Sequence, residues 1–286
     1  LRVVEGSSLT LPSLSAVTSL NQESNGASAL VYAGGTLNLG GGDQVLKSKV
    51  AFSAPAPYTF SGNLTLEEGA VLGAPVKAFG LGSSYFDITH TINVKGDLTI
   101  PKGAFASATR NCAYTTGGKT SKLGSHGGQT LWLKAVKGYA LTNGYDSILN
   151  PYMPGGSNYR GFNAGGVLNL VVDGVLTVDG RIYADGADPR GGDSTADGQA
   201  AGAGGSINIV AGELAGTTGS ITANGGSARY TYAGGAGGGR IAIRLTGEGS
   251  VFTDYWRTNI TAYGFSFATG RHGRDSSAGT VYLQDG

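Results

Sequence analysis

One short stretch, Gly204-Gly205-Ser206-Ile207-Asn208-Ile209, decides the fold of this chain. Two glycines lead into a triplet in which apolar residues flank a polar one. Alternation with a period of two places successive side chains on opposite faces of a β-strand, so Ile207 and Ile209 are expected inside and Asn208 outside. Similar triplets recur down the chain, and glycine usually precedes them. The nine copies begin at Leu9, Leu37, Leu64, Leu98, Leu131, Leu168, Ile207, Ile241 and Val281.

The spacing of these copies predicts a repeat architecture. Successive first positions differ by 27 to 40 residues, a period typical of stacked structural units. A second strand can be aligned at Ile182, Ile221 and Ile260, with steps of 39 and 39 residues. We therefore predict an all-β chain folded as a parallel β-helix (a β-solenoid), in which equivalent apolar residues stack inside. Connections between parallel strands are right-handed in about 98% of cases, so a right-handed helix is expected.

The composition agrees with this prediction and excludes several other classes. Glycine supplies 52 of 286 residues without a three-residue period, which excludes collagen, and a hydrophobic fraction of 40% argues against disorder. The charges nearly balance (20 basic, 19 acidic) without a basic run, so we expect no nucleic-acid partner. No apolar stretch approaches the roughly 18 residues that cross a membrane, so no membrane insertion is expected. A single cysteine, Cys112, excludes an internal disulfide framework.

We expect a single solenoid over residues 1–286 with three zones. Residues 1–110 form tighter coils, 111–164 form irregular loop excursions, and 165–286 form regular repeats of 34–40 residues. Glycine-rich loops follow the second strand of each regular repeat and should leave the same corner, so they are expected to stack on one side. These loops are 186–204, 225–238 and 264–279. The chain starts at Leu1, without Met or a signal peptide, which suggests a mature or trimmed fragment.

The later units resemble a known group of proteins. The stretches that carry the likeness are 204–209, Gly219-Ser220-Ile221-Thr222-Ala223-Asn224-Gly225-Gly226, Gly237-Gly238-Gly239-Arg240-Ile241-Ala242-Ile243 and Gly124-Ser125-His126-Gly127-Gly128. Over roughly residues 95–286 the chain is similar to the glycine-rich parallel β-helix (pectin-lyase-like) repeats of large secreted bacterial surface proteins. The resemblance implies an extracellular or cell-surface location. The broader β-helix group contains polysaccharide lyases, glycosidases, phage tailspikes and adhesins, but no lyase or hydrolase motif can be carried over residue by residue.

One loop is rich in aspartate and suggests a metal site. Asp185, Asp188, Asp193 and Asp197 could supply several of the six to eight oxygens that Ca²⁺ prefers. Their spacing matches neither an EF-hand nor the glycine-aspartate nonapeptide repeat. The alternative is a solvated loop stabilised by Asx-turns.

A histidine between glycines is the main candidate for chemistry. His126, together with Tyr145 and Asp146 of the next excursion, could act as a base or a ligand. The alternative is a histidine that hydrogen-bonds a loop carbonyl and holds two excursions together.

Two of the glycine-rich loops carry side chains suited to an acidic sugar. Arginine forks bind carboxylates and tyrosine rings stack on cations and sugars. The candidate residues are Arg229, Tyr230, Tyr232, Arg271, His272 and Arg274, and His272 is also a weak catalytic candidate. The alternative is an ordinary polar loop tip. Trp132 and Trp256 are further candidate sugar platforms.

Three functional hypotheses follow. The first is a structural or adhesive surface module, which could also associate end to end as a filament subunit. The second is a β-helix that binds a polysaccharide or cell-surface glycan through the stacked loops. The third is a polysaccharide lyase or glycoside hydrolase that acts on acidic glycans, although the charged residues lie mainly on loops rather than on strands.

Overall fold

The computed structural model describes fourteen segments of the chain, namely residues 2–3, 8–11, 29–33, 36–39, 42–46, 49–52, 58–73, 89–108, 126–128, 144–156, 164–188, 201–227, 235–265 and 276–286. Side chains are described within these segments except in residues 2–39, 49–52 and 89–90.

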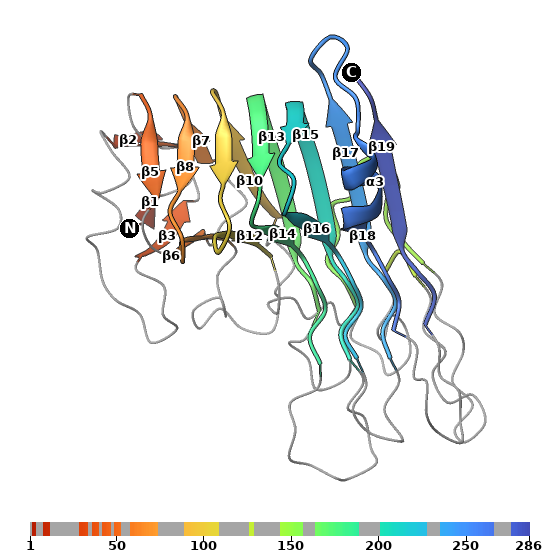
Figure 1. Cartoon of the computed structure of the whole chain (residues 1–286). Coiled ribbons are helices and arrows are strands. Elements are labelled where there is room, and N and C mark those ends of the chain that lie inside the picture. The colour runs from red at the N-terminus through yellow and green to blue at the C-terminus, as the bar shows by residue number, and fades with distance from the viewer. Residues whose placement is uncertain are drawn as a thin grey trace, which may run out of the picture.

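The described strands form two parallel sheets (Figure 1). In spatial order, the eight-stranded sheet consists of β1 (Arg2–Val3), β3 (Ala29–Ala33), β6 (Lys49–Phe52), β9 (Val71–Gly73), β12 (Phe105–Ser107), β14 (Arg181–Tyr183), β16 (Ser220–Thr222) and β18 (Ile260–Thr261). The main path of the eleven-stranded sheet consists of β2 (Ser8–Leu11), β4 (Thr36–Leu39), β7 (Tyr58–Phe60), β10 (Thr89–Val94), β13 (Val167–Val178), β15 (Ser206–Ala215), β17 (Arg240–Leu245) and β19 (Thr280–Gln284). Three short strands, β5 (Gln44–Leu46), β8 (Leu64–Leu66) and β11 (Leu98–Ile100), complete it beside that path. The all-β, parallel class predicted from the sequence is therefore confirmed.

The strand register reproduces the aligned repeats of the C-terminal half. Ile182 pairs with Ile221, and Ile221 pairs with Ile260, so the 39-residue spacing predicted from the sequence is the pairing register of the eight-stranded sheet. In the other sheet Ile207 pairs with Leu168 on one side and with Ile241 on the other. Because parallel strands pair in register, equivalent side chains of successive repeats lie directly beside one another.

Two of the nine triplets lie in a different place from the rest. Leu37–Leu39 pairs with Tyr58–Phe60, not with Leu64–Leu66, and Leu98–Ile100 pairs with the C-terminal part of β13. The strands β8 and β11 thus form a second column of short strands. The 27-residue step from Leu37 to Leu64 is therefore wrong as a repeat length, whereas the 34-residue step from Leu64 to Leu98 is a pairing register. Alternation reports that one face of a strand is buried, but it does not say which strand is the partner. The Leu131 triplet lies outside the described residues.

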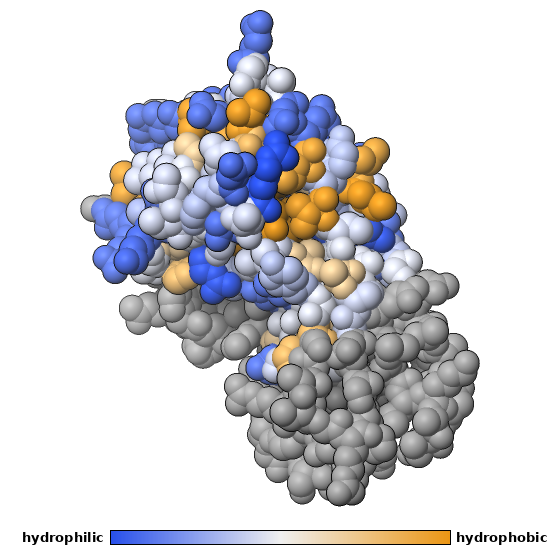
Figure 2. Space-filling view, turned by 45° about the vertical axis from the view of Figure 1, so that its right-hand side comes forward, coloured by the Kyte–Doolittle hydropathy of each residue, from blue (hydrophilic) through white to orange (hydrophobic). Residues whose placement is uncertain are grey.

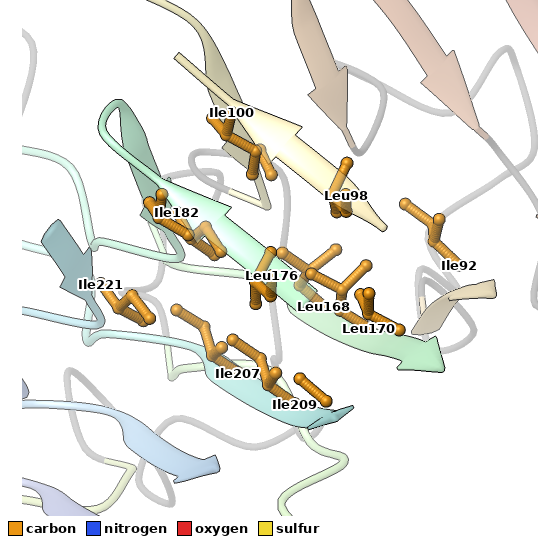
Figure 3. Close-up of a cluster of buried hydrophobic side chains, with 14 of the residues drawn as sticks. Ile92, Leu98, Ile100, Leu168, Leu170, Leu176, Ile182, Ile207, Ile209 and Ile221 are labelled. Carbon is orange, nitrogen blue, oxygen red and sulfur yellow. The ribbon is translucent and has the colours of Figure 1, made fainter. Parts of the chain in front are cut away.

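Leu, Ile and Val side chains fill the space between the two sheets (Figure 3). The inward residues of neighbouring strands, such as Leu168, Ile207 and Ile221, are fully buried. Burial of each such side chain stabilises the fold by about 1.5–3 kcal/mol. In the Leu168 and Ile207 triplets the polar residue faces outward as predicted, because Asn169 and Asn208 are partly exposed between buried neighbours.

One short helix, α3 (Asp254–Asn259), packs on the last repeats (Figure 1). Its Trp256 is only 1% exposed and lies in the same core, while the Tyr255 hydroxyl donates to the Gly219 carbonyl at 2.6 Å. The hypothesis that Trp256 is a sugar platform is therefore wrong, because a ligand cannot reach its ring. Trp132 lies outside the described residues.

The roots of the three glycine-rich loops lie side by side, as predicted, while the loop tips lie outside the described residues. Within each repeat the same bond closes the root, since Gly205, Gly239 and Gly279 donate their N–H to Ala184, Ala223 and Ala262 at 2.7 Å each. Between repeats Gly186 donates to the carbonyl of Asn224 at 2.8 Å. A Cβ added to Gly204 would lie 2.0 Å from the Ala223 carbonyl oxygen, so no other residue fits without moving the backbone.

Candidate functional site

Residues 144–156, which we call the strap, lie across the beginnings of β13 and β15. The Gly155 N–H donates to the Gly165 carbonyl at 2.9 Å, and the Ala203 N–H donates to the Gly156 carbonyl at 3.0 Å. At its other end the strap meets residues 126–128, because the Tyr145 N–H donates to the His126 carbonyl at 2.9 Å. The strap thereby joins residues 126–128 to the glycine-rich stretches that precede β13 and β15. It lies on the outer face of the eleven-stranded sheet.

Glycines position His126 close to the glycine-rich roots. The Gly128 N–H donates to the Gly238 carbonyl at 2.8 Å, and a Cβ on Gly127 would lie 2.2 Å from the Gly239 carbonyl oxygen. The sequence indicated this close approach of the backbone. As a result the His126 side chain is fully buried.

Asp146 is the centre of the site. Its backbone is left-handed, with φ of 76°, a conformation that aspartate tolerates better than most residues because its side chain bonds locally. The carboxylate accepts the N–H groups of Ser147 (2.7 Å), Tyr152 (3.0 Å) and Met153 (2.9 Å). Burial raises the pKa of Asp146, but the hydrogen bonds from His126 and from these backbone groups outweigh it and leave the pKa below its ordinary value.

His126 has a hydrogen-bond acceptor at each ring nitrogen. Its Nδ1 lies 2.9 Å from the Gly204 carbonyl oxygen, and its Nε2 lies 3.1 Å from Asp146 Oδ2. Only a ring protonated at both nitrogens donates to both acceptors, so the geometry favours an imidazolium paired with the Asp146 carboxylate. Both side chains are fully buried, so with His126 protonated at both nitrogens this contact is a buried ion pair.

Ser206 completes the cluster but does not form a catalytic triad. Its hydroxyl donates to the Met153 carbonyl at 2.6 Å and also lies 3.1 Å from Asp146 Oδ2 and 3.4 Å from His126 Nε2. In a triad the serine and the acid contact opposite nitrogens of the histidine. Here both lie at Nε2 and all three side chains are shielded from solvent, so the geometry fits the alternative in which His126 holds two excursions together.

Tyr145 is brought to His126 as the sequence predicted. The two rings lie 5.0 Å apart at their centroids, and the Tyr145 hydroxyl donates to the Pro154 carbonyl at 2.6 Å. That bond closes the strap on itself, because residues 145 and 154 lie near its two ends.

Two arginines of β17 hold the strap from below. Arg240 is 7% exposed and donates from Nε to the Tyr145 carbonyl at 2.7 Å and from Nη1 to Thr280 Oγ1 at 2.9 Å. Arg244 donates to the Leu149 carbonyl and to Asn208 Oδ1. Burial lowers the pKa of Arg240, and the nearby Asp146 charge opposes that shift.

Sequence reasoning missed Ser206, Arg240 and Arg244, although a signal was present. Ser206 and Arg240 each stand directly before a triplet and pair with one another in the sheet. Two-residue alternation places both on the outward face, together with Arg244. A serine and two arginines on one outward face would have marked that face for a polar partner.

The candidate calcium loop is only partly described. Asp185 accepts the Asn224 N–H at 2.7 Å and the Thr222 hydroxyl at 2.9 Å, and Asp188 accepts the Ser227 N–H at 2.7 Å. These donors belong to the next repeat, so both carboxylates accept hydrogen bonds that join one repeat to the next. Burial raises the pKa of Asp185 against these hydrogen bonds. Asp193 and Asp197 lie outside the described residues, and within the described part no group of three His, Cys, Asp or Glu residues is arranged to hold a metal.

The candidate glycan residues of the loop tips stay predictions. All six (Arg229, Tyr230, Tyr232, Arg271, His272 and Arg274) lie outside the described residues.

Among the described residues, no helix has the length and apolar character to cross a membrane. Comparison with models of protein families, with curated protein sequences and with solved structures found no match to this chain.

Proposed function

We propose that the chain is a parallel β-helix module of an extracellular or cell-surface protein, with a structural and adhesive role. The observation that supports it best is that every repeat of the C-terminal half adds one strand to each sheet at the same end. Ser206–Ala211 pairs with Arg240–Leu245 in one sheet, while Ile221 pairs with Ile260 in the other. A chain that coils through both sheets with each repeat contacting only its neighbours would have this pairing.

Removal of one whole repeat tests this architecture. Deletion of 206–239 (34 residues) joins Gly205 to Arg240 and preserves the register, because Ser206 and Arg240 pair with one another. A β-helix is expected to retain cooperative thermal unfolding at a lower Tm, since the remaining repeats still stack. Deletion of 206–215 is the matched control, and it should abolish folding because it removes β15 from one sheet but leaves β16 in the other. Loss of cooperative unfolding in both variants would contradict the β-helix.

The adhesive part of the proposal rests on the loop roots. Their hydrogen bonds hold the roots of three glycine-rich loops in one row, and we expect a long ligand to contact all three loops. Loop 225–238 carries Arg229 with two tyrosines, and loop 264–279 carries Arg271 and Arg274 with His272. These side chains suit an acidic glycan because guanidinium groups pair with carboxylates. Weak contacts repeated along one polymer add up to a stronger attachment.

Affinity electrophoresis against acidic and neutral polysaccharides tests the adhesive role. Binding to at least one acidic polymer is expected, and Tyr232→Ala together with Arg271→Ala should weaken it. Tyr263→Ala is the control, because Tyr263 is 63% exposed but lies at a root rather than a tip. Absence of binding to every polymer, or an equal loss in the control, would contradict the proposal.

Self-association is a second candidate, favoured by β19. In the described part of the chain β19 is the last strand of its sheet, and its Val281 is 41% exposed. Figure 2 shows hydrophobic residues gathered among hydrophilic ones on the face toward this end. Light scattering tests it: concentration-dependent growth that Val281→Lys abolishes is expected, and a monomer at all concentrations would overturn it.

A further inference from the structure

The strap is attached to the sheet mainly by polar bonds. Three of its large apolar side chains face solvent, with Ile148 at 49%, Leu149 at 50% and Tyr152 at 61% exposure, while Pro151 and Pro154 are buried. The contacts that hold it down are the Asp146 ion pair and the bonds to Ser206 and the two arginines described above. An element held in this way forgoes the roughly 1.5–3 kcal/mol that each buried apolar side chain supplies, and elements of low local stability open most readily.

Beneath the strap lies a short row of cations. Arg240 and Arg244 stand four residues apart on β17 and therefore on the same outward face, about 13 Å apart along the strand. Each donates to a main-chain carbonyl oxygen of the strap, Arg240 to residue 145 and Arg244 to residue 149. Asn208 and Thr280 on the two neighbouring strands extend the row with hydrogen-bonding groups.

The partners of these two arginines are electrically neutral. Among the described residues neither forms an ion pair with a carboxylate, whereas Arg181 pairs with Asp185 at 3.4 Å and Arg257 with Asp285 at 3.6 Å. Asp146, whose charge acts on Arg240, bonds to His126 instead. The bonds to the strap carbonyls already have a charged donor, but a carboxylate adds a negative charge and a second oxygen that pairs with the guanidinium fork, so carboxylate oxygens would bind these groups better than the strap carbonyls do.

We propose that the outer face of β15 and β17 is a second binding site for an acidic polysaccharide, and that the strap occupies it as an autoinhibitory cover. The carbonyl oxygens of residues 145 and 149 stand where ligand carboxylates bind once the strap lifts. Asn208 and Thr280 then bond sugar hydroxyls. The inference deepens the proposed adhesive function, on which its ligand class rests, but its residues are separate from the loop tips.

The His126–Asp146 ion pair sets how often the strap lifts. Among the described residues, the charged and titratable groups that act on this pair are Arg240 on β17 and Tyr145 on the strap, and neither supplies a second negative charge. Asp146→Asn keeps the shape of the side chain but removes the charge that the imidazolium requires. The apparent affinity of a covered site is reduced by the fraction of molecules that are open, so a larger open fraction tightens binding in proportion.

The test compares wild type with Asp146→Asn for binding to polygalacturonate by calorimetry, with hydrogen exchange of residues 144–156 as the readout of the strap. We expect faster exchange in the strap and an affinity at least about 10-fold higher. Addition of Arg240→Gln and Arg244→Gln should remove that gain. The matched control adds Arg181→Gln and Arg257→Gln, which remove the same charge from arginines that are about half exposed, and it should keep the gain.

Two results would overturn the inference. One is a strap that opens by hydrogen exchange without any gain in affinity, and the other is an equal loss in the control. Where Asp146→Asn does not fold, Ser206→Ala removes only the hydroxyl bonded to Met153 and should give the same change on a smaller scale. Dextran sulfate distinguishes sulfate from carboxylate as the acidic group, and a gain toward neutral dextran would show that charge is not involved.

The same measurements separate this site from the loops. Tyr232→Ala in the Asp146→Asn background should leave the gain intact, because the proposed covered site uses Arg240, Arg244, Asn208 and Thr280 and does not use Tyr232. A wild type that binds no polymer, combined with an Asp146→Asn variant that binds polygalacturonate, would contradict adhesion through the loops and support the covered site.

Discussion

Asp146 in the strap and Asp185 at a corner of the regular repeats both accept backbone N–H groups, the first with a fully buried and the second with a partly buried side chain, yet their pKa values shift in opposite directions. Burial raises the pKa of both. At Asp146 the buried His126 and three backbone donors overcome it, whereas at Asp185 the donors Asn224 and Thr222, with the more distant Arg181, do not. The strap depends on charge, and the repeats depend on apolar packing with neutral hydrogen bonds.

Removal of His126 should have the largest effect on the strap. His126→Ala leaves the Asp146 carboxylate buried without its cation, and loss of one member of a buried ion pair typically destabilises by about 3–5 kcal/mol. We expect hydrogen exchange of residues 144–156 to accelerate while β13 and β15 stay protected. Equal acceleration in both regions would show that the strap and the sheets open as one unit.

A substitution in the apolar core should destabilise the regular repeats rather than the strap. Ile209→Ala leaves a cavity between the sheets and should lower the free energy of unfolding by about 2–5 kcal/mol in urea denaturation. Ile148→Ala is the matched control on the strap, where the side chain is half exposed, and it should change the free energy of unfolding by less than about 0.5 kcal/mol. A comparable loss in both variants would mean that apolar contacts hold the strap after all.

Acid should loosen the strap before it loosens the corner at Asp185. The pKa of Asp146 is depressed, so its stabilisation is complete above its ordinary value of 3.8 and is lost as the pH falls through the lower folded value. The pKa of Asp185 is raised, so its contribution is present below 3.8 and is lost as the pH rises through the higher folded value. Hydrogen exchange, corrected for intrinsic rates and measured from pH 6 down to pH 2.5, should show opening of residues 144–156 first. Earlier opening around residue 185 would contradict these directions.

The smallest effect is expected at the corner itself. Asn224 occupies the position one repeat after Asp185 and accepts the Tyr263 N–H in the same way, at 2.7 Å. Asp185→Asn should therefore leave stability within about 0.5 kcal/mol of wild type in urea denaturation, because an amide oxygen accepts the same bonds without a buried charge. Asp146→Asn under the same conditions should destabilise the strap, which sharpens the contrast between the two aspartates.

Local pattern predicted the C-terminal half well because its signals are local. The register of Ile182, Ile221 and Ile260 follows from equal spacing, since a parallel sheet aligns equivalent residues. The N-terminal half was harder, because Leu64–Leu66 alternates like the other triplets but pairs in the second column. The strand that pairs with Leu37–Leu39, where the spacing predicted Leu64–Leu66, is Tyr58–Phe60.

What the sequence by itself determined is the period of the repeats, the inward and outward faces of each strand and the glycines that let loop roots touch, because each depends on residues close together in the chain. It also brought His126, Tyr145 and Asp146 together as candidates. Only the tertiary structure decided that Ser206, Arg240 and Arg244 join them and that His126 is buried. The physical reason is that the strap crosses three strands, so its partners lie 53 to 95 residues away in sequence, where no local pattern records which groups face one another.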